Sequence, residues 1–212
     1  MQFVRISAAA TLTLTVGSAH AQPAVVDFES IAAPTTLLSG GTAGTFLVAE
    51  DNIDVTAETF TLGTFSNVGN LTVNAAPAPI GSGNTGFIGN VLLDFDFTNL
   101  GYAVDQVTFD YANLGGGVNL GVNGNVIEPA RLATTPLTLF GINVAVTETA
   151  IAGGVAGTVT LTGALDSIQI GGQELVLDNV TAIPEPASST VAAGLLALTA
   201  TRLRRRDRQA SL

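Results

Sequence analysis

Short runs in which hydrophobic and polar residues alternate fill most of the chain after residue 24, and this pattern constrains the fold more than any other feature. In residues 104–111 the side chains of Val107, Phe109 and Tyr111 fall on one face of an extended chain, and polar side chains fall on the other. Residues 93–97 alternate in the same way. A period of two residues is typical of a β-strand with one buried face and one solvated face. Both runs are therefore predicted to be half-buried strands.

Turn signals separate these runs at fairly regular intervals. Asn123-Gly124 follows the apolar positions of residues 118–122, and this dipeptide readily adopts the positive φ angles of a tight hairpin turn. Two glycine pairs, Gly153-Gly154 and Gly171-Gly172, separate later runs and predict two further hairpins. No convincing amphipathic helix interrupts the strands. The pattern, together with 24 glycines, predicts an all-β domain over residues 22–182, namely a β-sandwich and more specifically a jelly roll.

The predicted domain is strongly acidic. Two of the 17 Asp and Glu residues, Glu185 and Asp207, lie near the C-terminus, which leaves 15 between Pro23 and Pro184. Arg131 is the only basic residue in that stretch, because the chain has no lysine, so 15 negative charges less one positive charge give −14. A field of this sign repels a phosphate backbone, whose binding depends on Lys and Arg. Nucleic acid is therefore excluded as a partner.

The first 21 residues have the organisation of a secretory signal peptide. Arg5 supplies an early positive charge, residues 6–17 are apolar, and Ala19-His20-Ala21 places small residues at the two positions that signal peptidase reads. A structural helix, the alternative, would be an apolar segment without a polar face. We therefore predict export by the Sec machinery and cleavage by signal peptidase before Gln22.

Most catalytic chemistries are excluded from the mature protein. The chain has no Cys, and its single His, His20, leaves with the signal peptide, so neither a histidine-dependent triad nor a zinc site with imidazole or thiolate ligands can form. A glycosidase needs only two carboxylates. Asp94 and Asp96 share one strand face, about 7 Å apart, but a solvated strand face also accounts for them. We therefore expect no enzymatic activity.

Acidic residues mark both ends of the predicted domain. Asp27 and Glu29 lie near its start, and Asp178 lies near its end, in the sequence Leu-Asp-Asn-Val. This arrangement resembles the carbohydrate-binding jelly-roll modules, in which the first and last strands lie close together and acidic residues there hold a structural calcium ion. The resemblance implies that these three residues are calcium ligands, and calcium does prefer oxygen ligands. The alternative is that they are ordinary strand-edge or turn residues.

Two further features bear on ligand binding. Residues 50–54, with Asp94 and Asp96, form a second candidate cation site, although they lack the glycine and distal glutamate of an EF-hand loop. Arg131 is a candidate partner for one of these acids, and the sequence does not choose which. Sugar binding has less support, because such modules commonly stack sugar rings on exposed aromatic side chains. The chain has no Trp and two Tyr, of which Tyr111 is expected in the core.

The last thirty residues contain three consecutive parts. The tripeptide Pro184-Glu185-Pro186 precedes an apolar segment, residues 188–203, and an arginine cluster, which comprises Arg202, Arg204, Arg205, Arg206 and Arg208. This order resembles the PEP-CTERM sorting domain over residues 183–208. An apolar segment of 16 residues is near the lower limit for a membrane-spanning helix, and the arginines obey the positive-inside rule. The sequence therefore predicts a C-terminal transmembrane helix with its basic end in the cytoplasm.

The resemblance implies processing by the membrane protease exosortase. Before processing, the protein would be tethered to the inner membrane; afterwards it would be at the cell surface or outside the cell, in exopolysaccharide or biofilm material. The alternative for the tail is a permanent membrane anchor. The expected function is that of an exported, noncatalytic surface or matrix protein. The alternatives are a calcium-stabilised carbohydrate-binding module and, with less support, a carboxylate-based glycosidase.

Overall fold

A computed structural model describes residues 21–75, 80 and 83–186 of the chain. Within it, Ala21–Glu185 form one compact unit. The predicted signal peptide, apart from Ala21, and the predicted apolar segment and arginine cluster of the tail lie outside the described residues. No helix in the described part is both long and apolar enough to cross a membrane.

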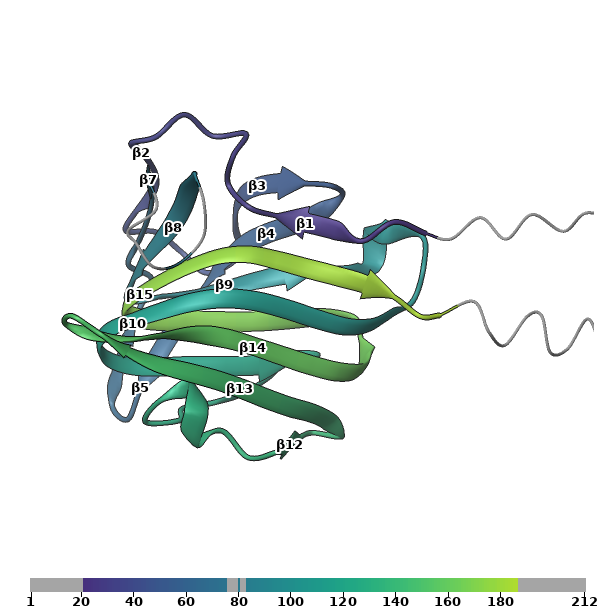
Figure 1. Cartoon of the computed structure of the whole chain (residues 1–212). Coiled ribbons are helices and arrows are strands. Elements are labelled where there is room, and N and C mark those ends of the chain that lie inside the picture. The colour runs from purple at the N-terminus through teal and green to yellow at the C-terminus, as the bar shows by residue number, and fades with distance from the viewer. Residues whose placement is uncertain (1–20, 76–79, 81–82, 187–212) are drawn as a thin grey trace, which may run out of the picture. The chain divides into compact units, whose positions relative to one another are not determined.

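Most of the described residues lie in antiparallel strands, and the helices among those residues are two single-turn 3-10 helices, η1 (Thr98–Leu100) and η2 (Leu132–Thr134) (Figure 1). The prediction of an all-β domain is confirmed. The strands are β1 (Ala24–Val26), β2 (Thr35–Ser39), β3 (Thr45–Glu50), β4 (Ile53–Glu58), β5 (Phe60–Leu62), β6 (Phe65–Asn67), β7 (Asn70–Ala75), β8 (Asn84–Gly89), β9 (Val91–Asp96), β10 (Val104–Val122), β11 (Asn125–Ile127), β12 (Thr138–Leu139), β13 (Ile142–Ile151), β14 (Gly154–Leu165) and β15 (Ser167–Pro184).

Thirteen of these strands are hydrogen-bonded into one sheet, and β5 and β6 form a separate pair. Strands β10 and β15 are long and change neighbours along their length. The first half of β10 pairs with the second half of β15, and this pair lies between β13-β14 on the β10 side and β8-β7-β2 on the β15 side. The second half of β10 pairs with the first half of β15, and this pair lies between β11 on the β10 side and β9-β4-β3 on the β15 side. This arrangement, in which two groups of strands share two long strands, is consistent with a β-sandwich.

Strand β15 shows that the hairpin predicted at Gly171-Gly172 is wrong. The strand runs without a break from Ser167 to Pro184. One of its edges pairs with β10, while the other pairs with β9 up to Gly172, with β8 from Leu175 to Leu177 and with β1 from Val180 to Ala182. The glycine pair therefore marks a change of neighbour and not a turn. A Cβ atom at Gly171 would lie 2.8 Å from the carbonyl oxygen of Val91, so the close approach of β9 requires glycine there.

The two other predicted hairpins are confirmed. Asn123 and Gly124, with φ angles of 49° and 77°, join β10 to β11, and Gly153, with a φ angle of 85°, lies in the turn between β13 and β14. The Asn123 side chain has a second role, since its Oδ1 accepts hydrogen bonds from the backbone N–H groups of Asp166 at 2.8 Å and Ser167 at 3.3 Å. It therefore ties this turn to the start of β15.

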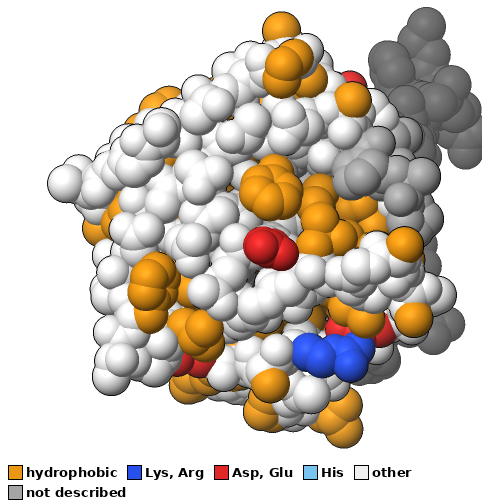
Figure 2. Space-filling model, turned by 90° about the vertical axis from the view of Figure 1, so that its left-hand side faces the viewer, with side chains coloured by type: hydrophobic (Ala, Val, Ile, Leu, Met, Phe, Trp, Pro, Cys, Tyr) orange, Lys and Arg blue, Asp and Glu red, His pale blue; other side chains and the backbone are white. Residues whose placement is uncertain are grey.

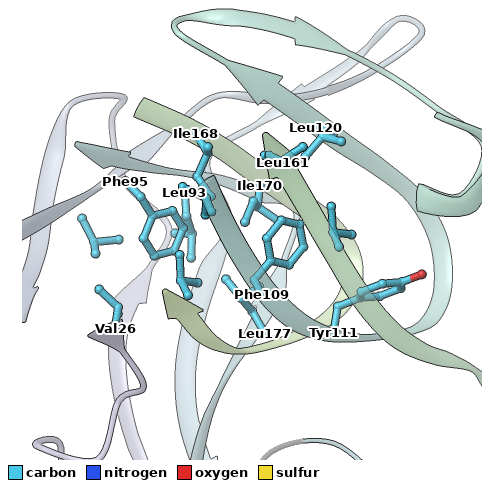
Figure 3. Close-up of a cluster of buried hydrophobic side chains, with 14 of the residues drawn as sticks. Val26, Leu93, Phe95, Phe109, Tyr111, Leu120, Leu161, Ile168, Ile170 and Leu177 are labelled. Carbon is cyan, nitrogen blue, oxygen red and sulfur yellow. The ribbon is translucent and has the colours of Figure 1, made fainter. Parts of the chain in front are cut away.

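The hydrophobic core contains the residues that alternation assigned to it (Figure 3). Val107, Phe109 and Tyr111 are at most 1% exposed, and the apolar positions of residues 93–97 are equally buried. The labelled side chains in Figure 3 come from β1, β9, β10, β14 and β15, so both long strands contribute to it. Burying a large apolar side chain stabilises a fold by about 1.5–3 kcal/mol, which explains why the inner faces of these strands are apolar throughout.

The first and last strands of the unit lie side by side, as the resemblance to jelly-roll modules implied. Strand β1 pairs antiparallel with the end of β15, with Ala24 opposite Ala182 and Val26 opposite Val180. The two ends of the described unit are therefore neighbours (Figure 1).

Candidate functional site

A cavity of about 420 Å³ lies over the solvent-facing side of β10, β13 and β14, and we call it the Asp110 groove. It is lined by Ile80, Asp110, Thr147, Thr149, Ile151, Ala156, Gly157 and Thr158. The strand register creates it, because Asp110 is the cross-strand partner of Thr158, and Thr158 is the partner of Thr147. One carboxylate and a row of hydroxyls therefore face the same space.

Two neighbouring strands hold the Asp110 carboxylate in place. Thr158 Oγ1 donates to Asp110 Oδ1 at 2.7 Å, and Asn179 Nδ2 donates to Asp110 Oδ2 at 3.1 Å. Each carboxylate oxygen therefore accepts one hydrogen bond from the described residues. An ionised carboxylate has about four acceptor sites, so Asp110 keeps acceptor capacity toward the groove.

The Asn179 side chain reaches Asp110 because strand β15 bulges there. Thr108 pairs with Thr181 and Asp110 pairs with Asp178, so β15 has one more residue than β10 between these two pairs. Asn179 has a φ angle of 53°, a left-handed conformation that costs a non-glycine residue free energy. Bulges of this kind redirect side chains and are frequent beside functional sites.

A second carboxylate lies beside the first. Asp178 is the cross-strand partner of Asp110, and its side chain is fully buried. Asp178 Oδ1 accepts a hydrogen bond from the backbone N–H of Asn179 at 2.8 Å, and Asn179 Nδ2 lies 3.4 Å from Oδ2. The Asn179 amide therefore links two acids of neighbouring strands. Burying a carboxylate without such bonds would be costly.

Apolar side chains also line the groove. Ile80, Ala112, Ala156 and Val176 form a small hydrophobic cluster that is separate from the main core. Ile151 packs against it. Since Ile80, Ile151 and Ala156 also line the cavity, the groove offers apolar surface as well as its carboxylate and hydroxyls.

The predicted calcium ligands occupy different hydrogen-bond arrangements. Asp27 Oδ1 accepts a hydrogen bond from the Glu29 N–H at 3.0 Å, and Glu29 Oε1 accepts one from the Asn84 N–H at 2.8 Å. Asp178, as described above, lies opposite Asp110. Among the described residues, no three or more His, Cys, Asp or Glu side chains are arranged to hold a metal ion. The calcium site stays a prediction.

In the second candidate cation site, residues 50–54 with Asp94 and Asp96, the first two acids accept hydrogen bonds that hold the fold together. Glu50 Oε2 accepts hydrogen bonds from the N–H groups of Asp27 at 3.1 Å and Phe28 at 3.0 Å, and Ser30 Oγ donates to Glu50 Oε1. Asp51 Oδ2 accepts a hydrogen bond from the Val25 N–H at 3.1 Å. These two acids therefore fasten the N-terminal segment to the turn between β3 and β4.

The remaining acids of that group lie on the polar face of β4 and β9. Asp54 and Asp96 are cross-strand partners, and Gln169 Nε2 donates to Asp94 Oδ1. Burial raises the pKa of Asp94 above its ordinary value, the hydrogen bond from Gln169 lowers it, and the nearby charge of Asp96 raises it.

Arg131 pairs with Glu148 and not with one of the acids at residues 50–54, 94 and 96, so the predicted choice of partners for Arg131 is wrong. Its Nη2 donates to Glu148 Oε2, and Tyr111 Oη donates to Glu148 Oε1 at 2.7 Å. Burial raises the pKa of Tyr111, and both the hydrogen bond and the charge of Glu148 raise it further. Tyr111 is fully buried, as predicted, and its hydroxyl connects it to the ion pair of Arg131 and Glu148.

Exposed aromatic rings are present, although the sequence argument considered only Trp and Tyr. Phe46, Phe65 and Phe140 are 59%, 43% and 57% exposed. On the face in Figure 2, hydrophobic side chains are scattered over the surface among few charged side chains. None of these three rings lines the Asp110 groove.

The tripeptide of the predicted sorting signal continues directly from the folded unit. Pro184 is the last residue of β15 and lies opposite Val104. The Glu185 N–H donates to the carbonyl oxygen of Ala103 at 2.9 Å, and Pro186 is exposed. The backbone at Pro184 is extended, which suits the fixed φ angle of proline and its lack of an N–H donor.

The Asp110 groove is the feature that sequence reasoning missed. Alternation placed Asp110 on a solvated face, and this is correct. Its partner Asn179 could not be found in this way, because a strict alternation ignores the extra residue of a bulge. No family model matches the chain, and neither a curated protein nor a solved structure matches it.

Proposed function

We propose that this protein is an exported, noncatalytic component of the cell surface or extracellular matrix that is delivered through its C-terminal sorting signal. The proposal depends on the order of three parts, the tripeptide at residues 184–186, the apolar segment and the arginine cluster, on a chain that begins like a signal peptide. In this proposal signal peptidase and exosortase process the two ends, and the acidic body is released into exopolysaccharide material.

The position of the tripeptide supports the proposal. Pro184 and Glu185 are hydrogen-bonded or paired within the β-domain, and residue 188 begins the apolar segment. Only a few residues therefore separate the folded cargo from the segment that would hold it at the membrane. A protein that worked as a permanently tethered receptor would gain reach from a longer linker, so this short connection favours a transient attachment.

The architecture supports a noncatalytic role in the same proposal. The acids of the second group are engaged in fastening the N-terminal segment or in cross-strand contacts, and the described body contains neither His nor Cys. For the fold, we propose that the two groups of strands form the β-sandwich and, more specifically, the jelly roll that the sequence favours.

Mass spectrometry of the protein from the surface fraction of its native host tests the proposal. The expected N-terminus is Gln22, and peptides that cover residues 202–212 should be missing from that fraction. Intact C-terminal peptides in the surface fraction would show that the tail is a permanent anchor. A chain whose Pro184, Glu185 and Pro186 are all replaced by Ala should stay in the membrane fraction.

A further inference from the structure

We infer that the Asp110 groove binds a neutral, hydroxyl-rich ligand, namely a pyranose ring of a neutral polysaccharide. The inference rests on the proposed function to the extent that export brings the protein into contact with such polymers. The choice of a neutral, hydroxyl-rich ligand is argued only from the residues that line the groove.

The acceptor capacity of Asp110 selects for hydroxyl donors. Thr158 and Asn179 each donate one hydrogen bond to it, one to each carboxylate oxygen. Each oxygen keeps at least one acceptor site, and the two oxygens lie side by side. Two adjacent hydroxyl groups on a sugar ring can donate to such a pair at once, in the way that paired donors engage a carboxylate.

The threonines complete a polar wall. Thr158 Oγ1 donates to Asp110, so its own oxygen accepts from a ligand, and the hydroxyls of Thr147 and Thr149 lie on exposed positions of β13. A threonine hydroxyl both donates and accepts. The hydroxyl groups of a sugar also donate and accept hydrogen bonds, so a ligand with many hydroxyls matches these threonines better than a ligand that has acceptors alone.

Apolar side chains in the groove match the C–H groups of a sugar ring. Ile80, Ile151 and Ala156 line the groove together with the carboxylate and the threonines. The C–H groups of a pyranose form apolar patches that can cover these side chains, and the volume of about 420 Å³ lies within the range that is usual for small-ligand sites.

The charge of the body separates neutral from acidic polymers. Arg131 is the only basic residue among the 165 residues of Ala21–Glu185, and it is paired with Glu148. Among the described residues no cation lines the Asp110 groove, and Asp178 is the cross-strand partner of Asp110. A polyuronate would therefore meet uncompensated negative charge, whereas a neutral glycan would not.

The test is affinity electrophoresis of the full chain in a polyoxyethylene detergent, which carries no sugar that could compete. Gels contain dextran, a soluble β-glucan, a galactomannan or polygalacturonate. We expect at least one of the three neutral polymers to retard the protein and polygalacturonate to have no effect. Retardation by none of the neutral polymers, or equal retardation by polygalacturonate, would overturn the inference.

Variants connect any retardation to the groove. Asp110→Asn removes the charged acceptor, and Thr147→Val removes an exposed hydroxyl without disturbing the core; a lost hydrogen bond to a charged group corresponds to a roughly tenfold loss of affinity. Asp105→Asn, on the same strand but outside the groove, is the matched control and should bind like the original chain. Thermal melting checks that each variant is folded. Unchanged binding by both groove variants would overturn the inference.

The same experiment separates this ligand from a metal ion and from failure of the proposed function. Retardation that disappears in EDTA would mean that the two acids hold a cation, and the inference would be wrong. Delivery to the surface is measured by fractionation and does not depend on Asp110. Loss of glycan binding with normal delivery therefore contradicts only this inference, and normal binding with failed delivery contradicts only the proposed function.

Discussion

Glu50 and Asp110 are both partly exposed carboxylates on strands of one sheet, yet their surroundings differ. Glu50 accepts hydrogen bonds from two backbone N–H groups and one hydroxyl, all within residues 27–30. Asp110 accepts one side-chain hydrogen bond at each oxygen and faces a cavity. The number and type of the donors thus distinguish an acid that fastens the chain from one that can take a ligand. Net charge alone cannot make this distinction.

The largest expected effect is on the Glu50 side of the comparison. Glu50→Ala leaves the N–H groups of Asp27 and Phe28 without their acceptor and should reduce the free energy of unfolding by about 3 kcal/mol, since each lost bond to a charged group costs about 1.5 kcal/mol or more. Glu58→Ala, on β4, is the control, because the described residues record no side-chain hydrogen bond for Glu58. It should change stability by less than about 0.5 kcal/mol. Chemical denaturation measures both, and equal stability of the two variants would refute the fastening role.

Bound calcium would remove the distinction between the Glu50 region and the Asp110 region, because the predicted ligands lie in both. Asp27 and Glu29 lie in the segment that Glu50 fastens, and Asp178 lies beside Asp110. If the three residues hold calcium, an ion at 100 times its dissociation constant should stabilise the fold by about 2.7 kcal/mol. Differential scanning calorimetry with calcium and with EDTA measures the shift, and identical melting temperatures would eliminate the site. Asp178→Asn should abolish any shift that is found.

Variants of Asn179 test how the carboxylate of Asp110 is held in place. Asn179→Ala removes the amide that links two acids and keeps a side chain in the left-handed conformation, so we expect a loss of about 2 kcal/mol. Asn179→Gly also removes the amide but relieves the backbone strain, and should be about 1 kcal/mol more stable than the alanine variant. Denaturant titration of the alanine and glycine variants measures the free energy of unfolding of each, and the difference gives the backbone strain at residue 179. If the alanine variant is as stable as the glycine variant, the bulge does not strain Asn179.

The smallest expected effect is on the pH dependence of stability and comes from Asp94, a carboxylate that neither fastens the N-terminal segment nor lines the Asp110 groove. Its pKa is higher in the folded protein than the ordinary value of 3.8, chiefly because of burial. The folded state therefore binds more protons than the unfolded state as pH rises above 3.8, and stability falls over that interval. Asp94→Asn should remove this decline, so its stability relative to the original chain should rise with pH. Asp96→Asn should weaken the decline without removing it, because the charge of Asp96 is a smaller cause. A decline that persists in Asp94→Asn would refute the assignment.

The sequence predicted the elements of this fold better than their connections. Alternation identified the inner faces of β9 and β10, because a half-buried strand imposes a period of two wherever it lies. Asn123-Gly124 identified a turn, because its backbone angles are local. The hairpin prediction at Gly171-Gly172 was wrong because glycine also permits a close neighbouring strand. The strands on that edge of β15, β9 and β8, lie more than 70 positions earlier in the sequence. The Asp110 groove could not be predicted for the same reason, since the contact of Asn179 with Asp110 spans 69 residues.

Strand β15 also has a consequence for the order in which this chain can fold. It pairs with β1, β8, β9 and β10, and it is the last strand before the tail. A chain that emerges from its N-terminus first cannot complete either group of strands until residues 167–184 have appeared. Pairings over such long separations in sequence form slowly. If the protein is exported as proposed, it would cross the membrane before it can fold, and folding would finish only as the tripeptide at residues 184–186 emerges.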